Sequence, residues 1–279
     1  MNDNELSVAI ETLLVARNPR HMQVARAALN PGYYLRAAQY LKDIRGVVII
    51  GTGFPVNSTF ETDGPVGAIA LYNALETLGA EPILACGSPL STSLTDDYRV
   101  LELTTSSLDA AHIEAQQQLE LLQPSAIVSI ERPGLAADGR YYNMRSEDIT
   151  ERCAFFDPFM SSANCSTIAI GDGGNEIGMG NVSDALKDLN IVPAATSCDE
   201  LIVADVSNWG AYGLISFLSI WHGSDLLKEI NPLGILKYIS ELGSVDGVTR
   251  INELTEDGLP VSEGESILRE LRQACGFRI

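Results

Sequence analysis

Residues 166–180 read STIAIGDGGNEIGMG, an apolar run followed by a loop that holds five glycines. The run 166–170 is short and apolar, which is typical of a buried strand. The loop is a poor structural element, because glycine loses the most entropy on ordering and packs no side chain. Its backbone can approach a ligand closely, and Asp172, Asn175 and Glu176 add two carboxylates and an amide. The stretch therefore predicts a strand that ends in a site for a small polar ligand or a metal ion.

Similar short, β-branched runs recur along the chain, with helix-length segments between several of them. The predicted strands are Val47–Ile50, Pro82–Ala85, Arg99–Leu103, Ala126–Ile130, Thr167–Ile170 and Leu201–Ala204. Helices are expected between them at Gly64–Leu78 and Ala110–Leu122. Strands that alternate with helices predict an α/β fold, with a mostly parallel sheet covered by helices on both faces.

Both ends of the chain have helical periodicity. The expected helices are Glu5–Ala16 and Tyr33–Ile44 at the start, and Trp209–Trp221, Pro232–Leu242 and Glu263–Cys275 at the end. No low-complexity linker separates them from the rest. We therefore expect one α/β domain over residues 1–279, with an N-terminal helical segment (1–45), an α/β core (46–222) and a C-terminal helical segment (223–279).

The composition restricts the partners and the compartment. The 18 Lys and Arg residues against 37 Asp and Glu give a net charge of −19, which argues against nucleic acid as a partner. No apolar stretch approaches the roughly 18 residues that cross a bilayer, so no membrane association is expected. Five cysteines without CxxC spacing, and a start without signal or transit character, favour a cytoplasmic protein. A homo-oligomer is left open.

Polar residues gather in the loops that follow the predicted strands. In parallel sheets such loops meet at one edge, where ligands collect. The loops are 51–55 and 61–65, 131–134 and 141–145, 171–180, and 205–210. Arg132 and Arg145 are candidate anion clamps, although they would also suit surface or packing roles. Asp63 and Asn208 face a similar alternative, because each precedes or begins an expected helix and both residue types cap helices.

The glycine loops do not match nucleotide motifs. Counted from Gly171, the G-x-G-x-x-G pattern would need glycine where Glu176 stands, and counted from Gly51 it would need glycine at Val56. A P-loop would need lysine at Met179. No nucleotide cofactor is therefore expected. As a set of metal ligands, the oxygen-bearing side chains of Asp172, Asn175 and Glu176 favour Mg²⁺ or Mn²⁺. Without a metal, the two carboxylates suit the roles of general acid and general base.

Taken together, these loops resemble the D-glutamate cyclase family, and in particular the C-terminal domain of its longer mitochondrial members, here as a stand-alone chain. The matching stretches are 51–54, 62–65, 131–134, 142–145, 171–180 and 208–210. The resemblance runs from about Gly46 to Trp221, and its most specific part is Asp-Gly-Gly-Asn-Glu-Ile-Gly at 172–178.

The resemblance implies that the chain is a lyase that cyclises D-glutamate to 5-oxo-D-proline with loss of water. Its implied catalytic residues are Asp172 and Glu176, which would hold the divalent ion, with Asp63 as the alternative base. Arg132 or Arg145 would pair with the α-carboxylate, and the amides of Gly173 and Gly174 would stabilise the oxyanion. The remaining implied substrate-binding residues are Thr52, Gly53, Thr62, Asn143, Asn175 and Asn208.

Two other classes of function stay open at this point. One is a different enzyme of small amino-acid derivatives on the same scaffold, such as a racemase or a lactam hydrolase. The other is a non-catalytic protein that binds an acidic metabolite.

Overall fold

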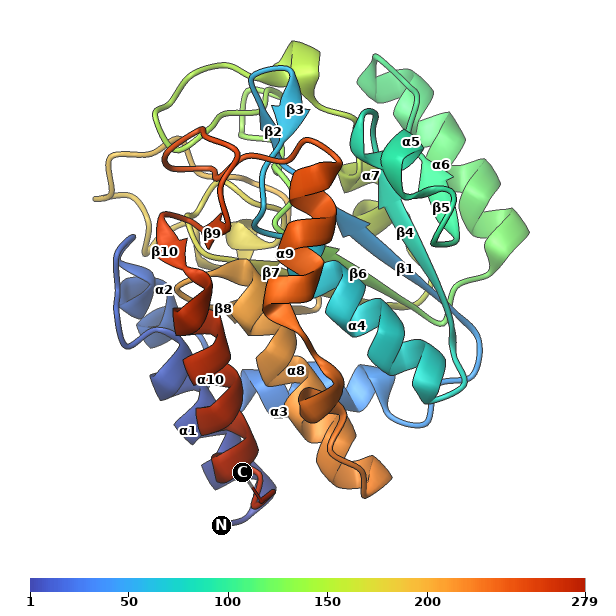
Figure 1. Cartoon of the computed structure of the whole chain (residues 1–279). Helices are drawn as coiled ribbons and strands as arrows, with labels where there is room; N and C mark the ends of the chain where they lie inside the picture. Colours follow the sequence, from blue (N-terminus) through green and yellow to red (C-terminus); the bar gives the residue numbers. More distant parts are fainter. Residues whose placement is uncertain (279) are drawn as a thin grey trace.

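The computed structural model describes residues 1–278 and is built around a six-stranded parallel sheet (Figure 1). Its strands are β1 (Val47–Thr52), β4 (Glu81–Cys86), β5 (Val100–Glu102), β6 (Ala126–Ile130), β7 (Ser166–Gly171) and β8 (Glu200–Val203). Each lies where the sequence predicts a strand, within two residues at either end. All neighbouring pairs in this sheet are parallel, which confirms the predicted fold class.

The order of the strands is β5-β4-β1-β6-β7-β8. The chain first moves outward from β1 to β5, then returns to the other side of β1 and continues to β8. This is the order found in dinucleotide-binding folds, although neither glycine loop carries their fingerprint. In such sheets a ligand binds beyond the carboxyl ends of the strands where the direction reverses. Here that point lies between β1 and β6.

Helices cover both faces of the sheet, with α3, α4 and α8 on one face and α6 and α7 on the other (Figure 1). The helices are α1 (Asp3–Leu14), α2 (Met22–Ala28), α3 (Tyr33–Leu41), α4 (Pro65–Thr77), α5 (Leu90–Leu94), α6 (Leu108–Leu122), α7 (Asp157–Ser161), α8 (Ser207–His222), α9 (Pro232–Glu241) and α10 (Val261–Ala274). The short helices α2, α5 and α7 were not expected. Helix α8 is apolar on all sides because it lies inside the molecule, where every residue from Ser207 to Ser219 is buried.

One apolar core runs through the sheet and both terminal segments. It includes Leu6 and Ile10 from α1 and Leu236 and Ile267 from α9 and α10. Helices α1 and α10 lie side by side, so the two ends of the chain meet (Figure 1). Among the described residues, no helix combines the length and the apolar character needed to cross a membrane.

Two antiparallel hairpins add to the sheet. They are β2 (Pro55–Val56) with β3 (Thr59–Phe60), and β9 (Thr255–Glu256) with β10 (Leu259–Pro260). The sequence predicted neither, because strands of two residues leave no periodicity to detect. Both carry or adjoin residues that line the cavity described next.

Candidate active site

A cavity of about 290 Å³ lies beyond the carboxyl ends of the strands. Its walls come from loops after β1 and β6, from the glycine loop (residues 171–180) and from both terminal segments. The lining residues include Arg20, Phe54, Asn57, Glu61, Glu131, Asn143, Met144, Arg145, Glu147, Arg152, Asn175, Gly247, Val248, Arg250 and Asp257. The cavity thus occupies the place where the reversal of strand order puts a ligand.

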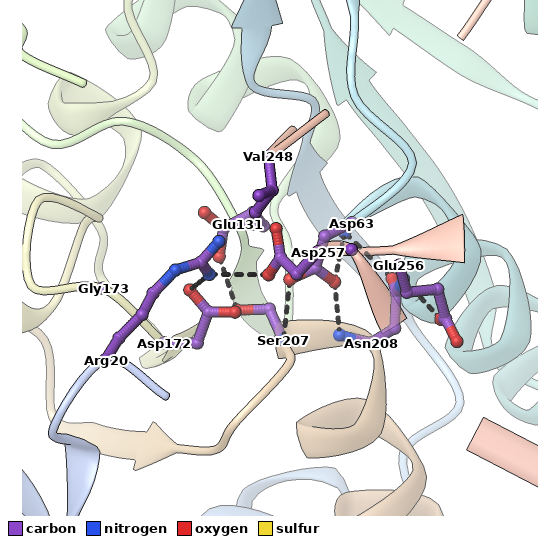
Figure 2. Close-up of polar contacts among 12 residues, drawn as sticks. Arg20, Asp63, Glu131, Asp172, Gly173, Ser207, Asn208, Val248, Glu256 and Asp257 are labelled. Atoms are coloured by element: carbon purple, nitrogen blue, oxygen red, sulfur yellow. Dashed lines mark hydrogen bonds and ion pairs between the residues drawn. The ribbon is translucent and has the colours of Figure 1, made fainter. Parts of the chain in front are cut away.

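The floor of the cavity contains a buried ion-pair bridge. Nη1 of Arg20 lies 2.5 Å from Oδ1 of Asp172 and 2.6 Å from Oδ2 of Asp257. Figure 2 shows the arginine reaching from one side towards Asp172, Glu131 and Asp257. Asp172 follows β7, whereas Arg20 lies between α1 and α2 and Asp257 lies in the β9–β10 turn. A residue from each end of the chain therefore completes the strand-end site.

Three buried carboxyl groups meet beside this bridge. Asp63, Glu131 and Asp172 each present an oxygen, and these oxygens lie within 4.8 Å of one another. Oδ2 of Asp172 is buried and accepts no hydrogen bond from the residues described. Such a trio could hold a metal ion, since hard cations prefer carboxylate oxygens. Of the metal ligands predicted from the sequence, the trio contains Asp172 but not Asn175 or Glu176.

The glycine loop is held together by its own carboxylate. Oε1 of Glu176 accepts a hydrogen bond from the amide of Gly173 at 2.8 Å, and Oε2 accepts one from Gly174 at 2.7 Å. The oxyanion role predicted for these two amides would require Glu176 to release them. Asn175 donates from Nδ2 to the carbonyl of Tyr142 at 2.9 Å, while its Oδ1 has no partner among the described residues.

Asp63 and Asn208 cap helices, as the alternative interpretation allowed, but each caps the helix that the other begins. Asp63 precedes α4 and accepts hydrogen bonds from the amides of Ser207 and Asn208, both at 2.8 Å, in the first turn of α8. Asn208 accepts from the amides of Gly64 and Gly67 at 2.9 and 2.6 Å. Gly67 permits this approach, because a Cβ there would lie 2.8 Å from the Cα of Asn208. The two caps fix the position of Asp63 in the trio.

The same helix start positions Glu131. The hydroxyl of Ser207 donates to Oε2 of Glu131 at 2.6 Å. Nearby, the carbonyl of Thr62 accepts a hydrogen bond from Asn208 at 3.2 Å, and the Thr62 hydroxyl is buried without a partner among residues 1–278.

The two candidate anion clamps lie in different environments. Arg132 is buried, and its Nη atoms donate to the carbonyls of Thr52, Gly53 and Ala154. It therefore ties the end of β1 to a neighbouring loop and does not line the main cavity. Arg145 is exposed at the cavity mouth. Its turn is held by Asn143, whose Nδ2 donates to Glu147 at 2.6 Å.

Three arginines, Arg145, Arg152 and Arg250, line the outer part of the cavity. Arg250 lies 3.3 Å from Glu147, an ion pair at the surface. For Arg152 the described residues offer no ion-pair partner within 4.0 Å. The mouth is thus cationic and the floor acidic, in a protein whose overall charge is −19.

Burial and mutual repulsion shift the pKa values of the floor carboxyls. Burial raises the pKa of Glu131 well above its ordinary value, and the charges of Glu176 and Asp63 raise it further. Burial likewise raises the pKa values of Asp63 and Asp172. For Asp257 burial acts in the same direction, but the charge of Arg20 outweighs it and lowers the pKa. The floor thus combines one carboxyl whose pKa is lowered with three whose pKa values are raised.

Several cavity residues have backbone angles that are unfavourable for side-chain-bearing residues. The φ angles are +53° for Asn57, +46° for Glu131, +59° for Arg250 and +53° for Asp257. Such conformations cost on the order of 1–3 kcal/mol each and cluster at functional sites. Four of the nine such residues in the described part of the chain line this cavity, which makes it a candidate active site.

The sequence did not single out Arg20, Arg152, Arg250 or Asp257. The segments that carry Arg20 and Asp257 were expected to be helical additions. One signal was available, since residues 243–258 hold three glycines and no helical periodicity, which is typical of a structured loop.

Comparison with known proteins gives a consistent match over most of the chain. Residues 10–272 match the family described as D-glutamate cyclase-like, C-terminal. The human protein named D-glutamate cyclase, mitochondrial, is 31% identical over an alignment of 230 residues, which covers 71% of this chain and 37% of the human protein. The chain thus spans well under half the length of that relative.

Similarity to solved structures is weak. An exopolyphosphatase-related protein from Bacteroides fragilis matches with a TM-score of 0.44 and 11% identity, over 89% of this chain and 58% of that one. The aldohexose dehydrogenase of Thermoplasma acidophilum matches with a TM-score of 0.28 and 14% identity, over 84% of this chain and 90% of that one.

Proposed function

This chain belongs to the D-glutamate cyclase-like C-terminal family, and from that premise we propose that it is a lyase that cyclises D-glutamate to 5-oxo-D-proline with loss of water. The observation that carries the proposal is the division of charge in the cavity. A cationic mouth and an acidic floor match a ligand with two carboxylates and one ammonium group. The human relative bears the name of this activity.

The arginines supply the first part of this match. Four of the 18 basic residues of the chain, Arg20, Arg145, Arg152 and Arg250, line this one cavity. A guanidinium–carboxylate pair is planar and often bidentate, so it fixes the orientation of a ligand as well as its charge. We propose that Arg145 and Arg152 receive the carboxylates of the substrate, since neither has an ion-pair partner within 4.0 Å among the described residues.

The reaction itself requires little beyond positioning and proton transfer. The α-amino nitrogen attacks the γ-carboxyl carbon, a C–N bond forms, one C–O bond breaks, and two protons from the ammonium leave with that oxygen as water. Nucleophile and electrophile share one molecule, so the protein has only to hold the substrate in its folded conformation. It must also accept a proton from nitrogen and give one to the leaving oxygen.

The floor carboxyls suit these proton transfers to different degrees. In Asp63 and in Glu176, both carboxyl oxygens already accept hydrogen bonds from backbone amides. Asp172 has one oxygen that accepts no hydrogen bond among the described residues, and Glu131 lies next to it at the cavity wall. We therefore place Asp172 and Glu131 at the centre of the chemistry, with Asp63 as the alternative base and Glu176 as the support of the loop.

A divalent ion would add to this chemistry. Asp63, Glu131 and Asp172 are the residues that would hold Mn²⁺ or Mg²⁺. When bound, such an ion would polarise the γ-carboxylate. Exhaustive chelation should then remove the activity and Mn²⁺ should restore it, while Glu131→Gln should weaken Mn²⁺ binding measured by calorimetry. A rate that survives chelation removes the metal from the proposal.

Product analysis tests the proposed reaction. The purified chain is incubated with D- and with L-glutamate, with and without Mn²⁺, and 5-oxoproline and both glutamate enantiomers are separated by chiral chromatography. We expect 5-oxo-D-proline from D-glutamate. Interconversion of the enantiomers would instead indicate a racemase, and consumption of added 5-oxoproline a lactam hydrolase. Saturable binding without any product would favour a metabolite-binding protein.

A further inference from the structure

One carboxyl group in the cavity has no partner in the protein. Glu61 lines the cavity and is 7% exposed, so its side chain is almost entirely removed from bulk solvent. In residues 1–278 its carboxyl oxygens accept no hydrogen bond, and no charged nitrogen lies within 4.0 Å of them. Neither oxygen is fully buried, so both are open to the cavity. A carboxyl group that the protein leaves without a donor is available there to a ligand.

The neighbouring carboxyls differ from Glu61 in this respect. Glu131 accepts from the hydroxyl of Ser207, and Asp257 pairs with Arg20. Asp63 and Glu176 accept from backbone amides, and Glu256 accepts from the side chains of Asn208 and Trp209. The protein therefore satisfies these carboxyls internally and leaves the carboxyl of Glu61 to the cavity.

The backbone holds Glu61 firmly in this position. Its amide donates to the carbonyl of Phe54 at 3.1 Å. On either side, the amide of Thr62 donates to Val245 at 2.9 Å and the amide of Val245 donates to Phe60 at 3.0 Å. These bonds join the segment after β3 to the loop that carries Asp257. The position of the unpartnered carboxyl is thus built by two separate segments.

Gly247 makes room for the carboxyl group. A Cβ at this position would overlap Oε2 of Glu61. The φ angle of Gly247 is not in the left-handed region, so its backbone does not itself require glycine. The absence of a side chain at 247 serves the placement of the Glu61 carboxyl.

We propose that Glu61 binds the α-ammonium group of the substrate and restricts the cavity to acidic amino acids whose amino group is free. This inference rests on the proposed function, from which it takes the ligand. The arginines at the mouth recognise carboxylates, which dicarboxylic acids without an amino group also possess. Glu61 supplies the negative partner that distinguishes an amino acid from such an acid. An N-acylated ligand lacks the ammonium charge and is rejected.

Binding of D-glutamate compared with glutarate tests this role, because the two differ only in the amino group. Dissociation constants are measured by stopped-flow tryptophan fluorescence before turnover, for the wild type and for Glu61→Gln. We expect the wild type to prefer D-glutamate by about tenfold or more, as a charged hydrogen bond implies. In Glu61→Gln the preference should fall to about onefold, with little change in the affinity for glutarate.

A second variant moves the carboxyl without removing it. Gly247→Ala should displace the Glu61 side chain and lower the preference for D-glutamate, and it should add little when combined with Glu61→Gln. Glu241→Gln, an exposed glutamate at the end of α9, is the matched control and should keep the wild-type preference. Thermal unfolding establishes that each variant is folded.

The outcomes separate this inference from the proposed function. A wild type that binds both ligands equally, or a folded Glu61→Gln variant that keeps the preference, overturns the role of Glu61. A wild type that prefers D-glutamate but makes no 5-oxoproline overturns the proposed reaction and leaves the role of Glu61 supported.

Discussion

Two loops line the same cavity, yet only one is conspicuous in the sequence. The glycine loop holds five glycines in ten residues, whereas the loop from Asp246 to Gly258 holds two in thirteen. In both, a buried carboxylate holds the backbone. Glu176 accepts two amides in the first, and Asp246 accepts the amides of Val248, Thr249 and Gly258 in the second.

Each loop uses one carboxylate to hold its backbone and another to take part in the site. In each loop the carboxylate that binds the backbone differs from the one that joins the site, which is Asp172 in the first and Asp257 in the second. Arg20 contacts both of these residues and so connects the two loops. Loss of this connection should have the largest effect, loss of a reactive group the next, and loss of a support or of the cavity mouth the smallest.

Removal of Arg20 should have the largest effect. Arg20→Gln leaves Asp172 and Asp257 buried without a cation, which should cost about 3–5 kcal/mol of the free energy of unfolding and abolish the formation of 5-oxoproline. Urea unfolding and product chromatography measure the two effects.

Arg99→Gln is the control for this change, because the Arg99–Glu81 pair is exposed and 3.4 Å long. It should change stability by less than about 1 kcal/mol and leave turnover intact. If Arg20→Gln were as stable and active as this control, neither stability nor turnover would depend on the contacts of Arg20 with Asp172 and Asp257.

Asp172→Asn tests the reactive group of the glycine loop. Asparagine has nearly the same shape as aspartate, and Asp257 remains as a partner of Arg20, so the fold should persist. Turnover should fall by about 10²- to 10⁴-fold, the usual contribution of a proton-transferring group. The test is the kcat of the variant relative to that of the wild type, measured on protein whose unfolding midpoint is unchanged. Wild-type kcat would exclude Asp172 from the chemistry.

The floor should also make stability depend on pH, and Glu256 shows this most clearly. Burial raises its pKa from 4.5 to about 7. Because the folded chain binds this proton more tightly, the stabilisation is complete below pH 4.5 and is lost as the pH rises through about 7. In Glu256→Gln the loss of stability between about pH 4.5 and pH 8 should be smaller by about 3 kcal/mol. An unchanged pH profile of urea unfolding would contradict this assignment.

Glu176 and Asp246, the carboxylates that hold the two loop backbones, should contribute similarly to stability and less to turnover than Asp172 does. Glu176→Gln and Asp246→Asn each place an NH₂ group against a backbone amide, which should cost about 1–3 kcal/mol. Hydrogen exchange should increase in the altered loop and not in the other. If Glu176→Gln lost as much turnover as Asp172→Asn without faster hydrogen exchange in its loop, Glu176 would have to be a reactive group.

The cavity mouth should give the smallest effect. Arg145→Gln removes an exposed guanidinium, so KM for D-glutamate should rise by about tenfold while kcat stays near the wild-type value. Arg140→Gln, which breaks the exposed Arg140–Asp148 pair, is the control. An unchanged KM in Arg145→Gln would assign the carboxylate to Arg152 or Arg250.

The sequence predicted the sheet well because each strand is a local apolar run between glycine, proline or polar residues, and this pattern needs no tertiary information. Asp63, Asp172 and Asn208 could be proposed for the same reason, since the ends of parallel strands meet at one edge. For the reciprocal capping of α4 and α8, the sequence predicted the two cap residues but not the helix that each one caps. A cap residue is recognisable from its local sequence, whereas the helix it contacts across the fold is not.

Arg20, Glu61 and Asp257 could not be assigned in this way. Arg20 and Asp257 lie about 150 and 85 residues from Asp172 along the chain, and only the folding of the terminal segments over the sheet brings them together. The role of Glu61 depends on a missing side chain at Gly247. Contacts between distant segments, rather than local patterns, determine which carboxyls are left for a ligand.

A crystal structure of the chain with D-glutamate bound tests most directly the claim that the terminal segments complete the active site. We expect the ligand in the cavity of about 290 Å³, with its carboxylates at the arginines of the mouth and its ammonium group at Glu61, beside Arg20 and Asp257. A ligand bound elsewhere, for example in the cavity of about 520 Å³ beside His112 and Pro158, would contradict this claim.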